Sequence, residues 1–347
     1  MQAQGPATKV HPPDGYYVRG VDRVDGRLLV VDSTANALRQ SSDWGATWSG
    51  NKGLPSGVGI TQVSKLVRFG NYIYLLATGS PSAGVWRAPP ATGDTPYVWS
   101  PQLLALTRGA TAIMTDLEVS TWGANDYLYS GDYGDPVGGP SMWRISLTDA
   151  NGAGTTWDRI YGPDRHQRHI HAVAPDPYNR GQVWATLGDG GTRTVLRSLD
   201  YGATWSVVIA DYHWQGVQIS FDPRYVYIAL DQPGFTYYVI DRATLQPHIA
   251  SPNSHAELAI PPPAPPGARY YAIANFGAVD PTTGAYYCVA NDTASSGSWM
   301  GMFFDRRVGM PVQVLDRGGP GINMNGEIFI AHGTVYSGTW QHLAVVS

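Results

Sequence analysis

The chain has 347 residues, a formal net charge of −4 and one cysteine, Cys288. The weak negative charge and the lack of a basic run argue against a nucleic-acid-binding surface, and a single cysteine excludes an intrachain disulfide. No stretch approaches the roughly 18 consecutive apolar residues that a membrane-spanning helix needs.

Glycine (41), proline (26), tyrosine (21) and tryptophan (12) are abundant, whereas the chain has only three glutamates and three lysines. Aromatic residues favour packed strands, glycine and proline favour tight turns, and glutamate and lysine are good helix formers. The composition therefore predicts short strands joined by turns, with little helix.

Turn signals divide the chain into units of roughly 35 to 55 residues, each long enough for four short strands. In chain order the predicted units cover residues 16–48, 61–99, 112–157, 168–209, 215–249 and 269–315, followed by an incomplete unit, 322–346. We expect the last unit to take its missing strand from the N-terminal segment 1–14, which closes a ring and removes the sheet edges. The proline-rich run 261–266 cannot pair in a central strand, so it is predicted to be an exposed connector.

An eight-residue pattern, S-x-D-x-G-x-T-W, occurs twice, each time after a short apolar run. Its aspartate can accept hydrogen bonds from the backbone that follows, its glycine allows a positive φ, and its tryptophan offers a large surface to bury against a neighbouring sheet. The shared positions are Ser41, Asp43, Gly45, Thr47 and Trp48 in the first copy and Ser198, Asp200, Gly202, Thr204 and Trp205 in the second.

The pattern resembles the Asp box of sialidase-type β-propellers. That resemblance implies a propeller in which the box is a structural turn on the face opposite the ligand site. Together with the repeated units, it predicts an all-β chain folded as one β-propeller domain over residues 1–347. We count seven four-stranded blades, with six as the alternative, in a ring closed by the N- and C-terminal strands.

A second repeat places an aspartate at the end of the second predicted strand of most units. Its members are Asp32, Asp132, Asp189, Asp231 and Asp292. Because strand direction alternates within a blade, these carboxylates are expected to lie on the face opposite the Asp boxes. Clustered carboxylates can hold sugar hydroxyls or a cation, and the alternative for each is an Asx turn that caps its own loop. We predict no cofactor and no resident metal, and the carboxylate ring leaves Ca²⁺ or another divalent cation as the alternative.

His169 and His171 open the fourth unit, and strand alternation places them on one face of its first strand. The same unit contributes Asp189 to that side. Such a group suits an imidazole–carboxylate metal site, a general base with its orienting partner, or a channel lining hydrogen-bonded to carbonyl groups. We take the candidate ligand-binding residues to be His169, His171, Asp132, Asp189, Asp231 and Tyr133.

Residues 125–206 as a whole resemble bacterial and phage proteins described as sialidase-like or BNR-repeat. The resemblance rests on the Gly131–Gly134 loop, on His169 and His171, on the run from Asp176 to Tyr178 and on the second Asp box. It implies a propeller and no established substrate. The arginine cluster and the tyrosine nucleophile of true sialidases are not recognisable, so we expect no sialidase activity.

A glycoside hydrolase needs two carboxyl groups about 5 to 10 Å apart across a sugar. Asp116 and Glu118 share one face of a predicted first strand, and Asp116 with Asp189 is a second pairing. If the protein is a hydrolase, Asp116, Glu118 and Asp189 are therefore the candidate catalytic residues. A polar channel lining is the interpretation that we favour for the Asp116–Glu118 pair.

Two functions follow. The first is a non-enzymatic bacteriophage virion protein, associated with the tail, for recognition of a host-surface glycan or for structural assembly. Its expected partners are host carbohydrate and other virion proteins, and it is expected to be a symmetric homo-oligomer in the virion or outside the cell. This function depends on the resemblance and on the N-terminal sequence, which has no signal-peptide pattern. The alternative is a secreted glycoside hydrolase or lyase that uses carboxylates on the ligand face.

Overall fold

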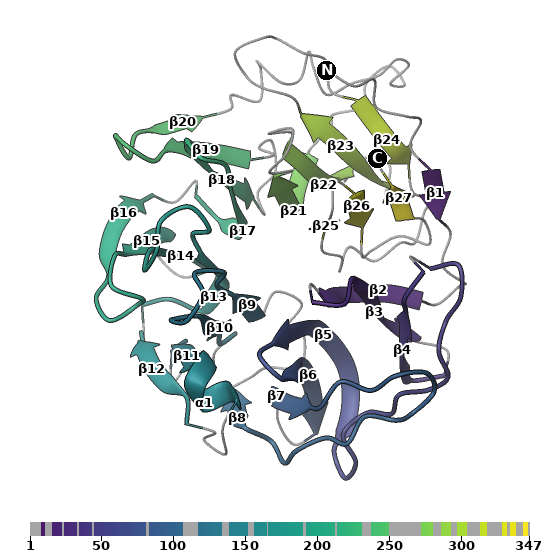
Figure 1. Cartoon of the computed structure of the whole chain (residues 1–347). Helices are drawn as coiled ribbons and strands as arrows, with labels where there is room; N and C mark the ends of the chain where they lie inside the picture. The colour runs from purple at the N-terminus through teal and green to yellow at the C-terminus, as the bar shows by residue number, and fades with distance from the viewer. Residues whose placement is uncertain are drawn as a thin grey trace. The chain divides into compact units, whose positions relative to one another are not determined.

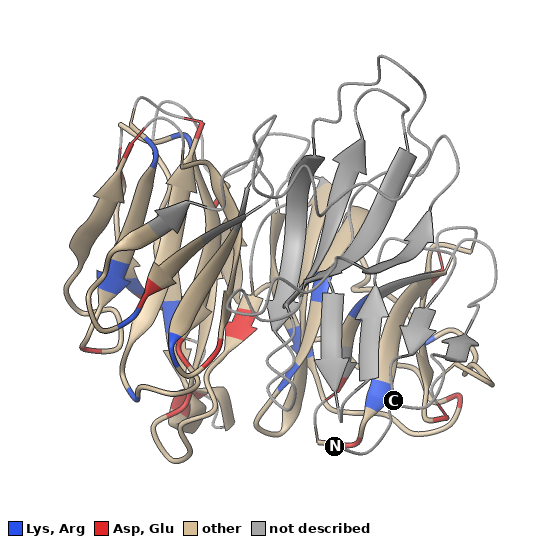
Figure 2. Cartoon of the chain, turned by 90° about the horizontal axis from the view of Figure 1, so that it is seen from above, with Lys and Arg blue, Asp and Glu red and all other residues tan. Residues whose placement is uncertain are grey.

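The computed structural model shows a chain built of antiparallel β-sheets (Figure 1). The structure describes residues 8–10, 16–22, 24–32, 35–43, 45–80, 83–106, 117–133, 139–151, 156–164, 166–189, 192–211, 214–230, 237–249, 272–279, 286–292, 297–303, 313–317, 328–331, 334–337 and 343–345. Over these ranges, no helix has the length and apolar character to cross a membrane. The helix α1 (Leu147–Asn151) has five residues. Basic and acidic residues are interspersed along the described strands and turns (Figure 2).

Contacts divide the chain into two compact units, and the first of them comprises residues 11–214. Its sheets are β2-β3-β4, β5-β6-β7-β8, β9-β10-β11-β12 and β13-β14-β15-β16. The strands are β2 (Tyr16–Asp22), β3 (Arg27–Asp32), β4 (Ala37–Ser41), β5 (Gly59–Phe69), β6 (Tyr72–Ser80), β7 (Ala83–Ala88), β8 (Leu104–Leu106), β9 (Leu117–Val119), β10 (Tyr127–Gly131), β11 (Met142–Ser146), β12 (Asp158–Tyr161), β13 (His169–Pro175), β14 (Val183–Gly188), β15 (Thr194–Ser198) and β16 (Ser206–Ala210).

The sheets of this unit stack face to face, in the manner of propeller blades. The first strands of successive sheets are in contact, β2 with β5, β5 with β9 and β9 with β13. Apolar side chains fill the space between sheets: Leu38 and Trp86 belong to one buried cluster, and Met142 and Val183 to another. Strands that are apolar on both faces fit this stacking, because each middle sheet is covered on both sides.

The second unit comprises residues 1–10 and 215–347. Its strands are β1 (Thr8–Val10), β17 (Gly216–Phe221), β18 (Tyr225–Leu230), β19 (Tyr237–Asp241), β20 (Pro247–Ile249), β21 (Ala272–Val279), β22 (Tyr286–Asp292), β23 (Gly297–Phe303), β24 (Gln313–Arg317), β25 (Ile328–Ala331), β26 (Thr334–Ser337) and β27 (Leu343–Val345). They form the four-stranded sheets β17–β20 and β21–β24 and the two-stranded sheets β25-β26 and β1-β27.

The N-terminal strand β1 pairs with the last strand, β27, with Thr8 opposite Val345 and Val10 opposite Leu343. The sequence predicted this pairing of the N-terminal segment with the incomplete last unit. The β25-β26 and β1-β27 pairs remain separate sheets, so a closed ring and a count of seven blades stay predictions. The single-domain prediction is likewise untested, and the connector 261–266 lies outside the described residues.

The predicted units follow the order of these sheets, but the bounds 61–99 and 112–157 end before the fourth strands of their sheets, β8 and β12. The first sheet has three strands, and the segment after Trp48 is not a regular strand. The segment instead makes two ladder-like hydrogen bonds to β4, from Ser49 N–H to the Gln40 carbonyl (2.9 Å) and from Lys52 N–H to the Leu38 carbonyl (2.8 Å). The Lys52 side chain is fully buried and donates to the carbonyls of the β7–β8 connection, which holds the segment away from a straight course.

The two Asp-box turns have the same hydrogen bonds. In the second, Asp200 accepts from the Thr204 N–H (2.8 Å) and hydroxyl (2.7 Å), while the Ser198 hydroxyl accepts from Gly202 N–H (2.8 Å). Asp43, Thr47, Ser41 and Gly45 repeat this network in the first turn. The glycines have φ values of 94° at Gly45 and 97° at Gly202.

The tryptophan of the second turn connects two neighbouring sheets. Trp205 donates its indole N–H to the carbonyl of Ile160 in β12 (2.9 Å). Its ring also packs edge-on against Tyr161, with 6.3 Å between ring centroids. The turn therefore attaches the β13–β16 sheet to the outer strand of the preceding sheet.

A β-bulge recurs in the first strand of most sheets. It leaves one residue out of register in each of β2, β13, β17 and β21, and β5 carries two such irregularities. The extra residue is Arg19 in β2, His171 in β13, Val217 in β17 and Asn275 in β21. Because a bulge bends its strand and redirects a side chain, this repeated irregularity positions the residues at the start of each first strand.

Candidate functional site

Strand pairing places the predicted ligand residues and the Asp box at opposite ends of one sheet. At one end of the β13–β16 sheet, His169 pairs with Gly188, the residue before Asp189. At the other end, Val183 pairs with Ser198, where the second Asp-box turn begins. The candidate site is therefore separated from that turn by the full length of the strands.

The position of His171 depends on the bulge in β13 and on a glycine in β14. Ile170 pairs with Leu187 and Ala172 with Thr186, which leaves His171 as the extra residue. Its ring lies against Gly188, where an added Cβ would be 2.3 Å from His171 Cε1. No side chain larger than hydrogen fits at this position without moving the ring.

His169, His171 and Asp189 converge on a single carboxylate oxygen. Asp189 Oδ2 lies 3.2 Å from His169 Nε2 and 3.8 Å from His171 Nε2. The two imidazole rings are nearly parallel, with centroids 5.8 Å apart. Tyr133 stacks on the His169 ring at a centroid distance of 3.5 Å and an interplanar angle of 11°.

Backbone hydrogen bonds bring Tyr133 to this group from the neighbouring sheet. Asp132 donates its N–H to the Ser141 carbonyl (2.9 Å), and its own carbonyl accepts from Ile170 N–H (3.2 Å). Asp132 thus joins the loop after β10 to the first strand of the next sheet. Its side chain is 3% exposed, so it acts as part of this support.

The imidazoles of both histidines face this carboxylate and hold the pKa of Asp189 far below its usual range, and His169, the nearer of the two, contributes most. The residue also has a left-handed backbone, with φ of 59°. Aspartate tolerates this conformation better than most residues, and such strained residues concentrate at functional sites. Asp189 is therefore ionised at neutral pH and lies in a left-handed turn.

Burial separates the accessible groups from the supporting ones. The Asp189 side chain is 27% exposed and Tyr133 is partly exposed, whereas the side chains of His169 and His171 are 9% and 0% exposed. Nδ1 of His169 is buried, and no hydrogen-bond partner for it is found among the described residues. A ligand at this end would contact the Asp189 carboxylate and the Tyr133 ring. The buried histidines would support Asp189 without contacting the ligand.

Other predicted site residues are not joined to this group by any contact within the described ranges. Asp116 and Asp231 lie outside the described residues, and only the backbone of Asp292 is described. Glu118 forms an ion pair with Lys65, which is 4% exposed. Asp32 accepts from Ala35 N–H (3.0 Å) and from Arg39 (2.9 Å), so it caps its own loop, as the Asx-turn alternative expected.

Within the described ranges, no three or more His, Cys, Asp or Glu side chains form a group that could hold a metal ion. The carboxyl groups whose pKa the structure shifts are Asp43, Asp189, Asp200 and Asp241, and all four are lowered. An ionised carboxylate can accept hydrogen bonds, act as a base or stabilise positive charge, and it cannot serve as a general acid.

An aspartate begins the turn that follows several of the first strands, and the sequence analysis did not predict this repeat. Asp22, Asp176 and Asp222 each accept hydrogen bonds from the N–H groups two and three residues ahead. The Asp-Pro dipeptides at 176–177 and 222–223 are the sequence signal that could have revealed it. These residues stabilise turns and do not belong to the site.

The structure also contains an open pocket of about 490 Å³ on the β12–β13 connection, next in sequence to His169. It is lined by Tyr161, Gly162, Pro163, Asp164 and His166. The sequence reading noted His166 only as a neighbour of the His169 motif. The Gly-Pro-Asp run is a turn signal, and nothing in it indicates that the turn is hollow.

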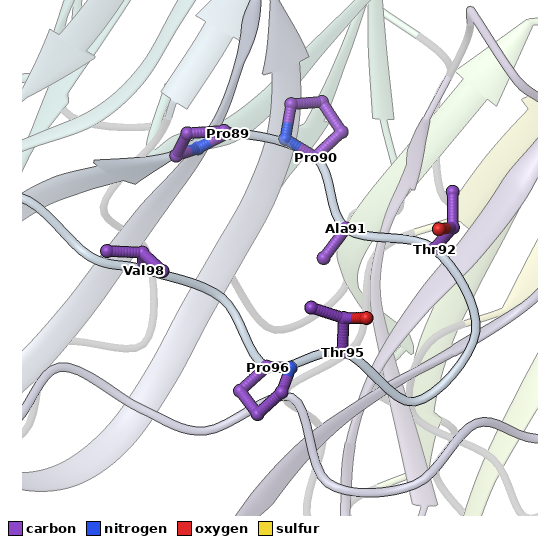
Figure 3. A pocket seen from close by; sticks show the side chains of 7 residues that line it. All are labelled: Pro89, Pro90, Ala91, Thr92, Thr95, Pro96 and Val98. Carbon is purple, nitrogen blue, oxygen red and sulfur yellow. The ribbon is translucent and has the colours of Figure 1, made fainter.

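A second pocket, of about 260 Å³, lies on the β7–β8 connection, between the third and fourth strands of its sheet. Figure 3 shows that the loop folds back on itself, with Pro89 and Pro90 in its first half and Pro96 in its second half. The lining carries no ionisable side chain: Pro89, Pro90, Ala91, Thr92, Thr95, Pro96 and Val98. The Thr95 carbonyl accepts from buried Lys52 (3.0 Å), which points to a structural role for this loop.

No model of a protein family matches the sequence, and neither does any curated protein. Solved structures do share the fold, and one is a GH74 enzyme from Niastella koreensis. It is 14% identical, with a TM-score of 0.58 and coverage of 89% of this chain and 47% of that one.

Two others are 11% identical to this chain. The extracellular domain of a putative one component system from B. thetaiotaomicron has a TM-score of 0.56, with coverage of 99% of this chain and 40% of that one. A puromycin-hydrolyzing peptidase from Mycobacterium tuberculosis has a TM-score of 0.55, with coverage of 95% and 48%.

This chain spans less than half the length of each of these three structures. At such low identity the likeness concerns the fold alone. Together with the stacked four-stranded sheets, it supports a β-propeller architecture for this chain.

Proposed function

We propose that this chain is a carbohydrate-binding propeller whose ligand site is built on Asp189 and Tyr133. The observation that carries the proposal is the fixed, ionised and partly exposed Asp189 carboxylate, with two buried imidazoles behind it and an aromatic ring beside it. Carboxylates accept hydrogen bonds from sugar hydroxyls, and aromatic rings cover the apolar face of a sugar.

The roles of the residues follow from their exposure. Asp189 would accept hydroxyl hydrogen bonds, and Tyr133 would supply the flat surface. His169 and His171 are buried, so they would not contact the ligand. They would position the carboxylate and keep it ionised. Pre-positioned groups favour binding because little side-chain entropy is lost when the ligand arrives.

The biological setting that we propose is a surface exposed to carbohydrate, either on a virion or outside a cell. A tail-associated protein that recognises a host glycan, with other virion proteins as neighbours, is the specific form of this proposal. It depends on the resemblance of residues 125–206 to phage and bacterial sequences.

A glycan-array screen with mass spectrometry of the bound glycans tests the binding function. We expect binding of intact glycans and a loss of affinity of about tenfold or more in Asp189→Asn, since a charge-assisted hydrogen bond is removed. Leu199→Ala is the matched control, because this residue is 63% exposed in the Asp-box turn at the other end of the sheet. Equal loss in both variants, or no binding by the wild type, would refute the proposal.

A glycoside hydrolase is the second candidate. A GH74 enzyme and a peptidase are among the structures that share this fold, so the fold is compatible with an enzyme. Asp189, being ionised, would then be a nucleophile or base, and the acid would have to be another carboxyl such as Asp116. Cleaved glycans in the same mass spectra would establish hydrolysis and overturn the non-enzymatic proposal.

A further inference from the structure

The pocket on the β12–β13 connection lies close in sequence to the Asp189 site, and a hydrogen bond connects the loops that carry the two. His166, which lines the pocket, precedes His169 by three residues, and three residues can span at most about 10 Å. Gln167, between them, is 8% exposed and donates its side-chain N–H to the Thr192 carbonyl (2.7 Å). Thr192 belongs to the same β14–β15 connection as Asp189, so the two loops are tied together beside the site.

Further hydrogen bonds place the pocket at the same end of the sheets as Tyr133. Asp164 donates its N–H to the Pro140 carbonyl (3.2 Å), and the adjacent Ser141 carbonyl accepts from Asp132 N–H. Tyr161, at the end of β12, pairs with Met142 at the start of β11. The pocket and the Asp189 site therefore share the loop between β10 and β11.

The lining of the pocket carries several hydrogen-bonding groups. The Tyr161 hydroxyl donates to Asp164 Oδ2 (2.5 Å), and His166 N–H donates to Asp164 Oδ1 (2.9 Å). Burial and the neighbouring Asp164 raise the pKa of the Tyr161 phenol, so it stays a neutral donor. An aromatic ring, a carboxylate and an exposed imidazole around an open pocket are groups that a sugar ring with several hydroxyls can use together.

We propose that this pocket is a second subsite of the same ligand site, and that the ligand is an oligosaccharide chain rather than a single sugar. One sugar would lie at Asp189 and Tyr133, and a following sugar would lie in the pocket against Tyr161, Asp164 and His166. This inference rests on the proposed carbohydrate-binding function and specifies its substrate class. It predicts that affinity grows with chain length.

The test uses the whole chain and a glycan array that carries mono-, di-, tri- and tetrasaccharides of each sugar series. We expect wild-type affinity to rise from mono- to trisaccharide. His166→Ala and Tyr161→Phe should lower affinity for the longer members about three- to tenfold, the value of one hydrogen bond, and leave affinity for the shortest member unchanged. His166 is exposed and the phenylalanine keeps the Tyr161 ring, so both variants are expected to fold, which circular dichroism checks.

Asp189→Asn separates this inference from the function on which it rests. If glycans bind through Asp189 but affinity is independent of length, or if both pocket variants bind every length normally, the second subsite is wrong and the proposed function stands. If no array member binds, or if Asp189→Asn has no effect, the proposed function fails and the subsite fails with it. Equal loss at every length in the pocket variants would also overturn the subsite, because it would indicate damage to the Asp189 site itself.

Discussion

Gly188 and Asp189 are consecutive in the chain, and both contact the histidines of the neighbouring strand β13. Gly188 lies under the His171 ring, and Asp189 takes a left-handed backbone to reach both imidazoles. Asp189 holds its charge because both imidazoles face it, and the histidines stay in place because they belong to a buried strand. The site is therefore a property of this short segment and its two histidine neighbours together.

Gly188→Ala should disturb the site directly. An added Cβ would lie 2.3 Å from His171 Cε1, and the ring is buried with little space to move. We expect a loss of about 1 to 3 kcal/mol in the free energy of unfolding, the usual range for overpacking a core, together with weaker glycan binding. Urea denaturation measures the first effect.

Gly57→Ala is the control for this substitution, because an added Cβ at Gly57 meets nothing within 4 Å. Its φ of 74° makes alanine locally strained, at a cost of about 1 kcal/mol, without touching the site. If both variants keep full binding, the packing of His171 against Gly188 does not position Asp189.

Asp189 should also make stability depend on pH. Its folded-state pKa is lowered below the unfolded value of about 3.9, so the unfolded state binds the proton first as the pH falls. The stability that Asp189 contributes is thus complete above about pH 5 and is lost as the pH falls below about 4.

Asp189→Asn is the matched variant for this pH dependence, because asparagine tolerates a left-handed backbone. We expect the difference in unfolding free energy between wild type and variant to shrink from about pH 5 to about pH 2.5. Urea unfolding at several pH values measures it, and the other carboxyl groups cancel because both proteins share them. A difference that is constant over this range would show that the histidines do not stabilise the ionised form.

At the scale of elements, the Asp-box turn attaches one sheet to the next. Ser198 is 1% exposed, and its hydroxyl accepts from Gly202 and Asp200 N–H while donating to Asp200. The same turn carries Trp205 to the Ile160 carbonyl of the preceding sheet. A change in this turn should affect the packing of two sheets, at the end away from the ligand site.

Ser198→Ala should therefore cost stability and leave binding intact. Two backbone N–H groups lose their acceptor, so we expect a loss of about 1 to 3 kcal/mol in unfolding free energy. Ser206→Ala, an exposed position with one hydrogen bond to the Arg197 carbonyl, should change it by less than about 0.5 kcal/mol. Weaker glycan binding by Ser198→Ala would contradict the separation of turn and site.

For the whole molecule, the pairing of the two chain ends is the feature with the largest expected consequence. Strand β1 covers one edge of β27, and contacts join it to the unit that contains residues 215–347. An uncovered strand edge loses ladder hydrogen bonds and invites association with other chains.

Deletion of residues 1–10 should lower the thermal unfolding midpoint and promote aggregation on heating. Deletion of residues 1–7 is the control, because it leaves β1 (Thr8–Val10) intact. Differential scanning calorimetry with light scattering measures both effects. Identical behaviour of the two deletions would show that the β1–β27 pair does not contribute to stability, and would weaken the predicted closure of a ring.

Local patterns were the part of this protein that its sequence could determine. The two S-x-D-x-G-x-T-W turns, the order of the sheets and the partner of the last strand depend on local turn chemistry or on repeated turn signals, so the sequence indicated them. Asp189 and His169 lie at one end of one sheet, as expected, because the start of β13 and the end of β14 meet there in an antiparallel pair. Their role as ligand contacts stays a prediction.

Only the tertiary structure decided which groups are accessible and which act together. The Glu118–Lys65 pair joins strands far apart in the sequence, and the bulge at His171 and the contact of its ring with Gly188 depend on the register between β13 and β14. Burial of His169, His171 and Asp132 gives these three predicted ligand residues a supporting role in the proposed site, and the pocket at His166 had no sequence signal. The physical reason is that exposure and contact are properties of packed neighbours, whereas turn chemistry lies within a few consecutive residues.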